Sequence, residues 1–230
     1  GKVLPVQEAT RLIAIHEPIA AQLPEHVLPY PQARQLVLFG EGPFVALDCP
    51  CRLARNQPCS PLDVCLIIGE PFASLLLHHN PAHARIISRE QAIATVEAAA
   101  NRGNVHHAFF KQGMLGRFYA LCNCCSCCCG AISAHLNGVP MLVSSGYVAQ
   151  VAVENCVRCG ACVKRCPFGA LTLQGTALVD EGATLQGTAL VDEARCMGCG
   201  VCERACPHSV IALRRDAAKP APLFSALHNA

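Results

Sequence analysis

The sequence lacks long runs of charge and of apolar residues. Charged residues make up 15% of its 230 positions, the net charge is +2 with neutral histidines, and no cluster of Lys and Arg stands out. Nucleic-acid binding is therefore not indicated, because it depends on concentrated positive charge. No apolar run reaches the roughly 18 residues of a direct membrane span. The first segment, GKVLPVQEATRLIAIHEP, lacks the charged and then apolar order of a signal peptide. We therefore expect a cytoplasmic protein.

Cysteine is the residue present in excess. The chain has 18 cysteines. They form three groups: Cys49, Cys51, Cys59 and Cys65; Cys122, Cys124, Cys125, Cys127, Cys128 and Cys129; and Cys156, Cys159, Cys162, Cys166, Cys196, Cys199, Cys202 and Cys206. Because the cytoplasm keeps thiols reduced, this density indicates metal binding rather than disulfides.

The third group consists of two copies of one motif. CVRCGACVKRCP at 156–167 and CMGCGVCERACP at 196–207 both read C-x2-C-x2-C-x3-C-P. In this spacing three cysteines wrap around one cubane, and the fourth, before proline, ligates the other cluster. Two zinc sites fit less well, because zinc ribbons use paired C-x2-C knuckles. A disulfide framework is the other alternative.

The motif predicts two [4Fe–4S] clusters. The expected ligands are Cys156, Cys159, Cys162 and Cys206 for one cluster, and Cys196, Cys199, Cys202 and Cys166 for the other. Gly160 and Gly200 follow the second cysteine of each motif, and we expect them to let backbone N–H groups approach the sulfurs.

This region resembles the two-cluster bacterial ferredoxins over about residues 147–215. The resemblance implies a pseudo-twofold α+β fold with two short hairpins and helices, and single-electron transfer. Short strands are expected at 147–153 and near 210–213. The segment TLQGTALVDE occurs at 172–181 and again at 184–193. We interpret one copy as the hairpin between the motifs and the other as its extension. The identity of the copies also fits a recent duplication or a sequence-assembly error.

The N-terminal region is predicted to be a separate, mainly α-helical and loop domain. Residues 8–21 have apolar positions at helical spacing. Residues 87–103 are the strongest helix candidate, with a capping box formed by Ser88 and Gln91 and a terminating Gly103. The α+β chain is thus divided into a cysteine-rich domain at 1–145, a ferredoxin domain at 146–215 and a tail at 216–230.

The ten N-terminal cysteines leave three interpretations open. Neighbouring side chains diverge in helix and strand alike, so the six cysteines at 122–129 cannot all face one cubane and indicate two directions of binding. In the first interpretation, both groups bind one or two further iron–sulfur clusters, with Cys49/Cys51 and Cys122/Cys124 as facing C-x-C clamps. The second is a structural zinc site, and the third is free buried or redox-active cysteines.

The arrangement is similar to that of multi-cluster ferredoxin-like proteins of anaerobes. In these a CPCR…C…CL region, an IS-x-E-x-A helix and a CNCC-x-CCC segment precede a two-cluster ferredoxin domain. The matching positions here are 49–52, 59, 65–66, 87–92, 105–106 and 122–129. The resemblance implies an oxygen-sensitive redox protein without naming a reaction.

We predict a low-potential single-electron carrier, or an electron-transfer subunit of a larger oxidoreductase complex, with redox proteins as partners. No Gly-rich nucleotide loop, catalytic triad or flavin fingerprint is visible, so no catalytic residue is assigned. The alternative is a redox enzyme whose N-terminal cluster reduces a substrate or a disulfide with electrons from the ferredoxin domain.

Overall fold

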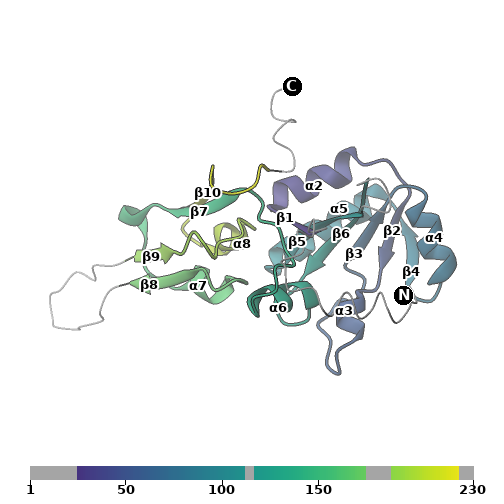
Figure 1. Cartoon of the computed structure of the whole chain (residues 1–230), viewed down its shortest axis with the longest axis horizontal. Coiled ribbons are helices and arrows are strands. Elements are labelled where there is room, and N and C mark those ends of the chain that lie inside the picture. Colours follow the sequence, from purple (N-terminus) through teal and green to yellow (C-terminus); the bar gives the residue numbers. More distant parts are fainter. Residues whose placement is uncertain (1–24, 112–116, 175–187, 223–230) are drawn as a thin grey trace, which may run out of the picture.

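A computed structural model of the chain describes residues 25–111, 117–174 and 188–222. The described residues form a larger part built on a six-stranded sheet and a smaller part built on two two-stranded sheets (Figure 1). The helix predicted at 8–21 lies outside these residues. The domain limits predicted from the sequence stay predictions.

The larger part is an antiparallel sheet. Its strands are β1 (Glu25–Leu28), β2 (Phe44–Leu47), β3 (Cys65–Ile68), β4 (Ala84–Ile87), β5 (Val105–Lys111) and β6 (Arg117–Cys124). Their spatial order is β1-β5-β6-β3-β2-β4, and every neighbouring pair is antiparallel. This order places β3 next to β6 in the middle of the sheet, so the two strands that carry N-terminal cysteines are neighbours.

This sheet corrects the prediction of a mainly helical and loop N-terminal domain. Four of its strands have only four residues each, with sequences such as FVAL and CLII. Such short runs do not show enough positions for strand alternation to be recognised. They are stabilised by pairing and burial in the sheet more than by local preference. The broader α+β class holds, because helices and strands both occur.

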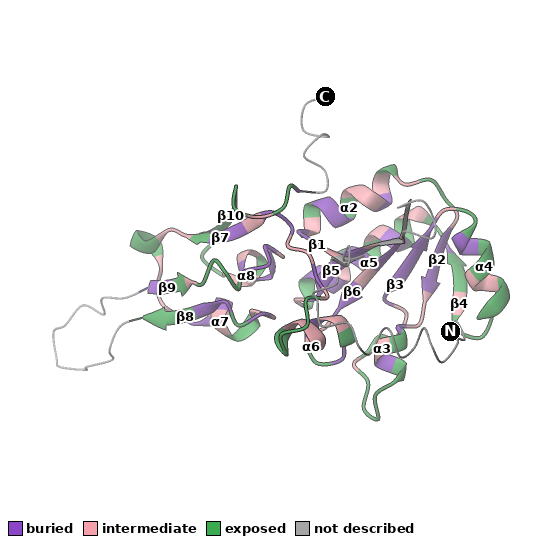
Figure 2. Cartoon of the chain, viewed as in Figure 1, coloured by how far each residue is buried: buried purple, intermediate pink, exposed green. Residues whose placement is uncertain are grey.

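Helices cover both faces of the sheet. The helices α2 (Tyr30–Phe39) and α5 (Arg89–Asn101) pack on one face, and α4 (Phe72–His79) packs on the other. Figure 2 shows the buried positions concentrated along β2 and β3, between these layers. The short helices α3 (Pro50–Leu53) and α6 (Gly130–Leu136) lie next to each other at one end of the sheet (Figure 1).

The helix predicted at 87–103 is confirmed as α5. The Gln91 backbone N–H donates to Ser88 Oγ at 3.2 Å, and the Ser88 N–H donates to Gln91 Oε1 at 2.9 Å. These two bonds complete the capping box. Val96 is fully buried against the sheet, and Gly103 follows the helix with φ of +80°. The amphipathic pattern and both ends of this helix were therefore encoded locally.

The smaller part contains two antiparallel strand pairs, one of which joins its first and last strands, and short helices. Its elements are β7 (Tyr147–Val151), a 3-10 helix (Val153–Asn155), α7 (Ala161–Arg165), β8 (Leu171–Gln174), β9 (Thr188–Val191), α8 (Val201–Ala205) and β10 (Ile211–Arg215). β7 pairs with β10 and β8 with β9, both antiparallel. The strands predicted near 147–153 and 210–213 correspond to β7 and β10.

The repeated TLQGTALVDE segment supplies the β8–β9 pair. The register joins Gln174, from the first copy, to Thr188, from the second, and Leu171 to Val191. The two arms therefore come from different copies, whereas the sequence interpretation placed the hairpin within one copy. Residues 175–187 lie outside the described part of the chain.

The two parts are in contact through an apolar cluster and polar bonds. Val27, Val105 and Ile132 of the larger part pack with Phe168 and Met197 of the smaller part. At the end of α5, Arg165 Nη1 donates to the Arg102 carbonyl at 3.1 Å, and the Arg204 guanidinium lies 4.5 Å from the Tyr30 ring centroid. None of the helices in the described residues has the length and apolar character needed to cross a membrane.

Candidate metal centres

The first ferredoxin motif and the last cysteine of the second line one small cavity. Its cysteines are Cys156, Cys159, Cys162 and Cys206, the set predicted for one cluster. Leu173, Ala189 and His208 are among the other lining residues, and the cavity volume is about 20 Å³. Gly160 starts α7 with φ of +73°. These four thiols could hold one cluster of cubane size, because all of them face the same closed space.

The second motif builds an equivalent cavity. Its cysteines are Cys166, Cys196, Cys199 and Cys202, and its volume is about 10 Å³. Backbone N–H groups reach two of the sulfurs: Ala170 N lies 3.3 Å from Cys166 Sγ, and Ala149 N lies 3.5 Å from Cys196 Sγ. The role predicted for Gly160 and Gly200 in such contacts stays a prediction. Burial raises the pKa of the Cys202 thiol well above its ordinary value. Metal binding at this site must therefore displace protons from neutral thiols.

The two ferredoxin motifs have the same backbone conformation at equivalent positions. Gly160 and Gly200 both adopt positive φ, and so do Arg158 and Gly198 at the third position of each motif. A Cβ on Gly198 would lie 2.3 Å from the Tyr147 carbonyl oxygen, so this position excludes a side chain. Sequence reasoning missed Gly198, since the corresponding residue of the first motif is arginine.

Six N-terminal cysteines surround a third and larger cavity. They come from the α3 region (Cys49, Cys51), from β3 and β6 (Cys65, Cys122, Cys124) and from the start of α6 (Cys129). Each sulfur is in hydrogen-bonding contact with two others, in the order Cys49, Cys51, Cys129, Cys124, Cys122, Cys65 and back to Cys49. We call this set the sulfur ring. The Sγ atoms of Cys65 and Cys122 are 3.6 Å apart.

The β3–β6 pairing places the ring cysteines on one face of the sheet. Cys122 and Cys124 alternate with Asn123, which is fully buried on the opposite face. Asn123 Nδ2 donates to the Val64 carbonyl at 2.7 Å, and Asn123 Oδ1 lies 2.6 Å from His106 Nδ1. These bonds join β6 to the residue before Cys65. They therefore hold both cysteine-bearing strands in register.

One ring cysteine is electrostatically distinct. Hydrogen bonds from the Cys129 and Cys49 thiols, helped by the Arg55 guanidinium, lower the pKa of Cys51 to about 2. The pKa values of Cys65 and Cys124 are raised, mainly by sharing protons with Cys122. Thiolate is the metal-binding form of cysteine, so the lowered pKa of Cys51 favours metal binding at this position.

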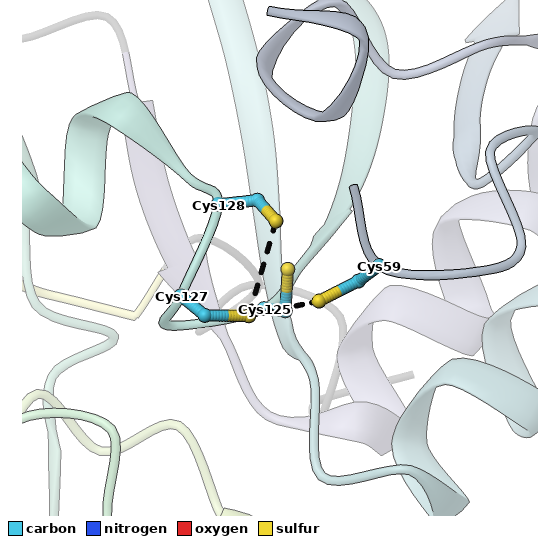
Figure 3. Close-up of side chains that lie close together, drawn as sticks. All are labelled: Cys59, Cys125, Cys127 and Cys128. Atoms are coloured by element: carbon cyan, nitrogen blue, oxygen red, sulfur yellow. Dashed lines mark hydrogen bonds between the residues drawn. The ribbon is translucent and has the colours of Figure 1, made fainter. Parts of the chain in front are cut away.

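The other four N-terminal cysteines form a separate set, which reaches the surface at Cys127. Ligand atoms of Cys59, Cys125, Cys127 and Cys128 all lie within 4.8 Å of one another (Figure 3). Cys127 Sγ is 2.9 Å from Cys59 Sγ and 3.9 Å from Cys128 Sγ. Arg55 Nη2 donates to the Cys128 carbonyl at 3.2 Å. We call these four residues the outer set; four convergent sulfurs are sufficient for a cubane or a zinc ion.

The structure thus divides the ten cysteines into six and four. The two directions of binding predicted for 122–129 correspond to Cys122, Cys124 and Cys129 on the ring side, and to the remaining three on the outer side. The CPCR region contributes to both sites, since Cys59 belongs to the outer set. Whether the two sites bind metal, and which metal, stays a prediction.

Two further residues lie near these sites and were not assigned to them from the sequence. His107 is fully buried on β5, and its ligand atoms lie within 4.8 Å of Cys124 and Cys129 sulfur. Arg52 is also buried, and its charge opposes the rise that burial causes in the pKa of Cys125. The position of His107 follows from its pairing with Cys122 across β5 and β6. The register between β5 and β6 could not be inferred before the pairing of these strands was known.

The family match covers the segment that carries the carboxy-terminal cysteines. Residues 155–210 match the family described as a 4Fe-4S dicluster domain. No curated protein shows a significant match to the chain. The chain therefore contains a dicluster iron–sulfur domain, which supports a general role in electron transfer. The matched segment begins after the sulfur ring and the outer set.

Proposed function

We propose that this protein is a low-potential single-electron carrier, or the electron-transfer subunit of a larger oxidoreductase complex. One [4Fe–4S] cluster would be held by Cys156, Cys159, Cys162 and Cys206, and the other by Cys166, Cys196, Cys199 and Cys202. The two small cavities support this assignment, because each collects four thiols in an apolar space. Bound clusters of this type supply one-electron redox chemistry, whose potential depends on hydrogen bonds to sulfur and on exclusion of water.

The observation that carries the proposal is the apolar cluster between the two parts. Phe168 and Met197, which line the second ferredoxin cavity, pack in the same cluster as Cys124 and Cys129 of the sulfur ring. Cys166 and Cys199 border this cluster from the other side. Electron exchange falls steeply with distance. Centres that border one packed apolar cluster are therefore well placed to exchange electrons.

The proposal extends to the N-terminal cysteines as two further iron–sulfur centres, one on the sulfur ring and one on the outer set. The outer set reaches the surface, since Cys127 is exposed. A carrier needs such a point of contact for a redox partner. The ring contacts the second ferredoxin cavity through the apolar cluster, and it is connected to the outer set through Arg55, which lies near both Cys51 and Cys128. The ring therefore lies between the ferredoxin cavities and the outer set.

Freeze-quench EPR tests the proposal. The full chain, purified without oxygen, is mixed with a photochemically generated one-electron donor. We expect ferredoxin-type signals first and a change in the N-terminal centres afterwards. In Cys202→Ser, which removes a ligand of the second cluster, roughly four irons are lost and the N-terminal change slows at least tenfold. Leu75→Ala, at an exposed position of α4 outside every candidate centre, is the control, with all iron–sulfur signals and the N-terminal rate retained. Equal N-terminal rates in Cys202→Ser and the parent protein would contradict the proposal.

A second candidate function rests on the volume of the ring cavity, which is about 370 Å³. A redox enzyme would use part of this space for a small substrate beside the metal centre. Carbon monoxide and cyanide distinguish the two functions, because both bind iron with an open coordination position. A shift of the N-terminal EPR signal on addition of either ligand supports the enzyme, and an unchanged signal supports the carrier.

A further inference from the structure

The sulfur ring is closed, with no break between one subset of cysteines and the rest. Every member contacts two ring neighbours, including Cys65, which links Cys122 to Cys49. Any four cysteines chosen to hold a cubane would leave two thiols in direct contact with its ligands. The geometry therefore gives no reason to separate four ligands from two spectators.

The ring cavity is also far larger than the two cavities of the dicluster domain. It measures about 370 Å³, against about 20 and 10 Å³ for the ferredoxin cavities. Those two cavities each have four cysteines, the number a single cubane takes. The ring cavity therefore has more ligands and more space than a cubane requires. The rest of its lining is mostly apolar and includes Ile67, Leu76 and Phe109, with the phenol of Tyr119 beside them.

The negative charge of six thiolates is a further argument for several metal ions in the ring. Six thiolates in one site, four of them buried, would be strongly unfavourable without compensation, because ionised groups lose their hydration on burial. The residues that line the ring cavity in the described part of the chain include no Lys or Arg to balance six negative charges. Additional metal ions inside the ring would supply the missing positive charge.

We infer that the sulfur ring binds a single iron–sulfur centre of more than four irons, ligated by all six cysteines. The inference rests on the proposed function, since it takes the N-terminal cysteines to bind iron. A cubane has four irons, each with one outward position for a thiolate. Six thiolates around one cavity therefore require a larger centre. The adjacent residues Cys128 and Cys129 face different sites, so this centre is separate from the outer set.

Iron counting in a variant without a functional outer set tests the inference. The variant is the full chain with Cys59→Ser and Cys127→Ser, which removes the closest sulfur pair of that set. After anaerobic purification from ⁵⁷Fe-grown cells, iron, sulfide and zinc are measured and Mössbauer spectra recorded. We expect more than about twelve irons per chain, because the dicluster domain accounts for roughly eight and the ring for more than four. A content of twelve or fewer, or zinc in the ring, overturns the inference.

Six single Cys→Ser substitutions in the ring, made in that same background, supply a second readout. We expect each of them to remove or alter one common Mössbauer species while the ferredoxin signals persist. Cys125→Ser, in the outer set, is the matched control and should leave that species unchanged. If two ring substitutions leave the species intact, the ring holds a cubane with two spare thiols and the inference fails.

The two failures are distinguishable. Loss of the ferredoxin signals from the parent protein would remove the proposed function itself. Intact ferredoxin signals with four or fewer irons in the ring would remove only the larger centre. The iron count of the double variant does not depend on the six substitutions in the ring. It therefore decides the question even where one of those six variants fails to fold.

Discussion

The ferredoxin cavities and the sulfur ring collect thiols in different ways. In each ferredoxin motif three cysteines come from one short segment, shaped by residues with positive φ such as Gly160, Gly198 and Gly200. The ring joins cysteines from α3, β3, β6 and α6, which meet only because β3 pairs with β6. The first kind of site depends on local backbone conformation. The second depends on sheet register and on the packing beneath it.

This contrast predicts that damage to local conformation will be confined to one ferredoxin cavity. Gly198→Ala should have the largest effect, because its Cβ would lie 2.3 Å from both the Tyr147 carbonyl oxygen and Ser145 Oγ. We expect loss of the second cluster, roughly four irons, with the first cluster and the N-terminal centres retained. Iron analysis and EPR measure the outcome.

Gly160→Ala is the matched control for that substitution. Its φ is also positive, at +73°, but its Cβ would be 3.4 Å from the end of the Leu173 side chain. The expected cost is about 1–2 kcal/mol of conformational strain, with the cluster retained. Equal iron loss in both variants would show that the close backbone approach at Gly198 is not the cause.

A defect in the core under the sheet should act on the N-terminal centres instead. Leu66 is fully buried in β3 beside Cys65, in the core formed with α2 and α5. Leu66→Ala should lower the free energy of unfolding of the larger part by about 2–5 kcal/mol, through lost burial and a cavity. Anaerobic urea titration, with N-terminal and ferredoxin signals followed separately, measures this change.

The matched control for the core is Leu75→Ala, since Leu75 is exposed on α4. Its expected effect lies within about 0.5 kcal/mol. The comparison between the two regions would break down if Leu66→Ala released ferredoxin iron as readily as N-terminal iron.

Acid should weaken the larger part through His106. Burial lowers the pKa of His106 to about 4, and the nearby His107 and Arg204 act in the same direction. Because the folded pKa lies below the unfolded value of about 6.5, the unfolded state binds the proton first as pH falls. Stability is therefore complete above pH 6.5 and declines towards pH 4, by about 2 kcal/mol between pH 8 and pH 5.

Urea titrations of the parent protein and of His106→Gln across this pH range isolate that contribution, since effects common to both proteins cancel. The difference between them should shrink by the stated amount at low pH. A difference that stays constant from pH 8 to pH 5 would contradict the role of His106.

The smallest expected effect concerns the cap of α5. Ser88→Ala removes the side chain that accepts a hydrogen bond from the Gln91 N–H, and should cost about 1 kcal/mol. Thr95→Ala, within the same helix, should stay within about 0.5 kcal/mol. Thermal unfolding followed by circular dichroism distinguishes them. An equal effect of both changes would remove the capping box as a source of stability.

The same contrast explains what could be predicted from the sequence. Each ferredoxin motif and the capping box of α5 lie within a few consecutive residues. The spacing of the residues alone is therefore enough to predict these features. The six-stranded sheet was missed, because β2, β3 and β4 have four residues each. Without the β3–β6 pairing, nothing could show that Cys65 meets Cys122 while Cys59 joins the outer set.

Alternation along β6 limits how this chain can change length during evolution. Leu121 and Asn123 face the core beneath α5, whereas Cys122 and Cys124 face the ring cavity. One inserted residue in this strand would exchange the two faces, placing sulfur in the core and leucine among the ligands. The β8–β9 pair, in contrast, joins strands on either side of the junction between two copies of a duplicated segment. Among relatives, we expect insertions between β8 and β9 and an invariant spacing from residue 121 to residue 124.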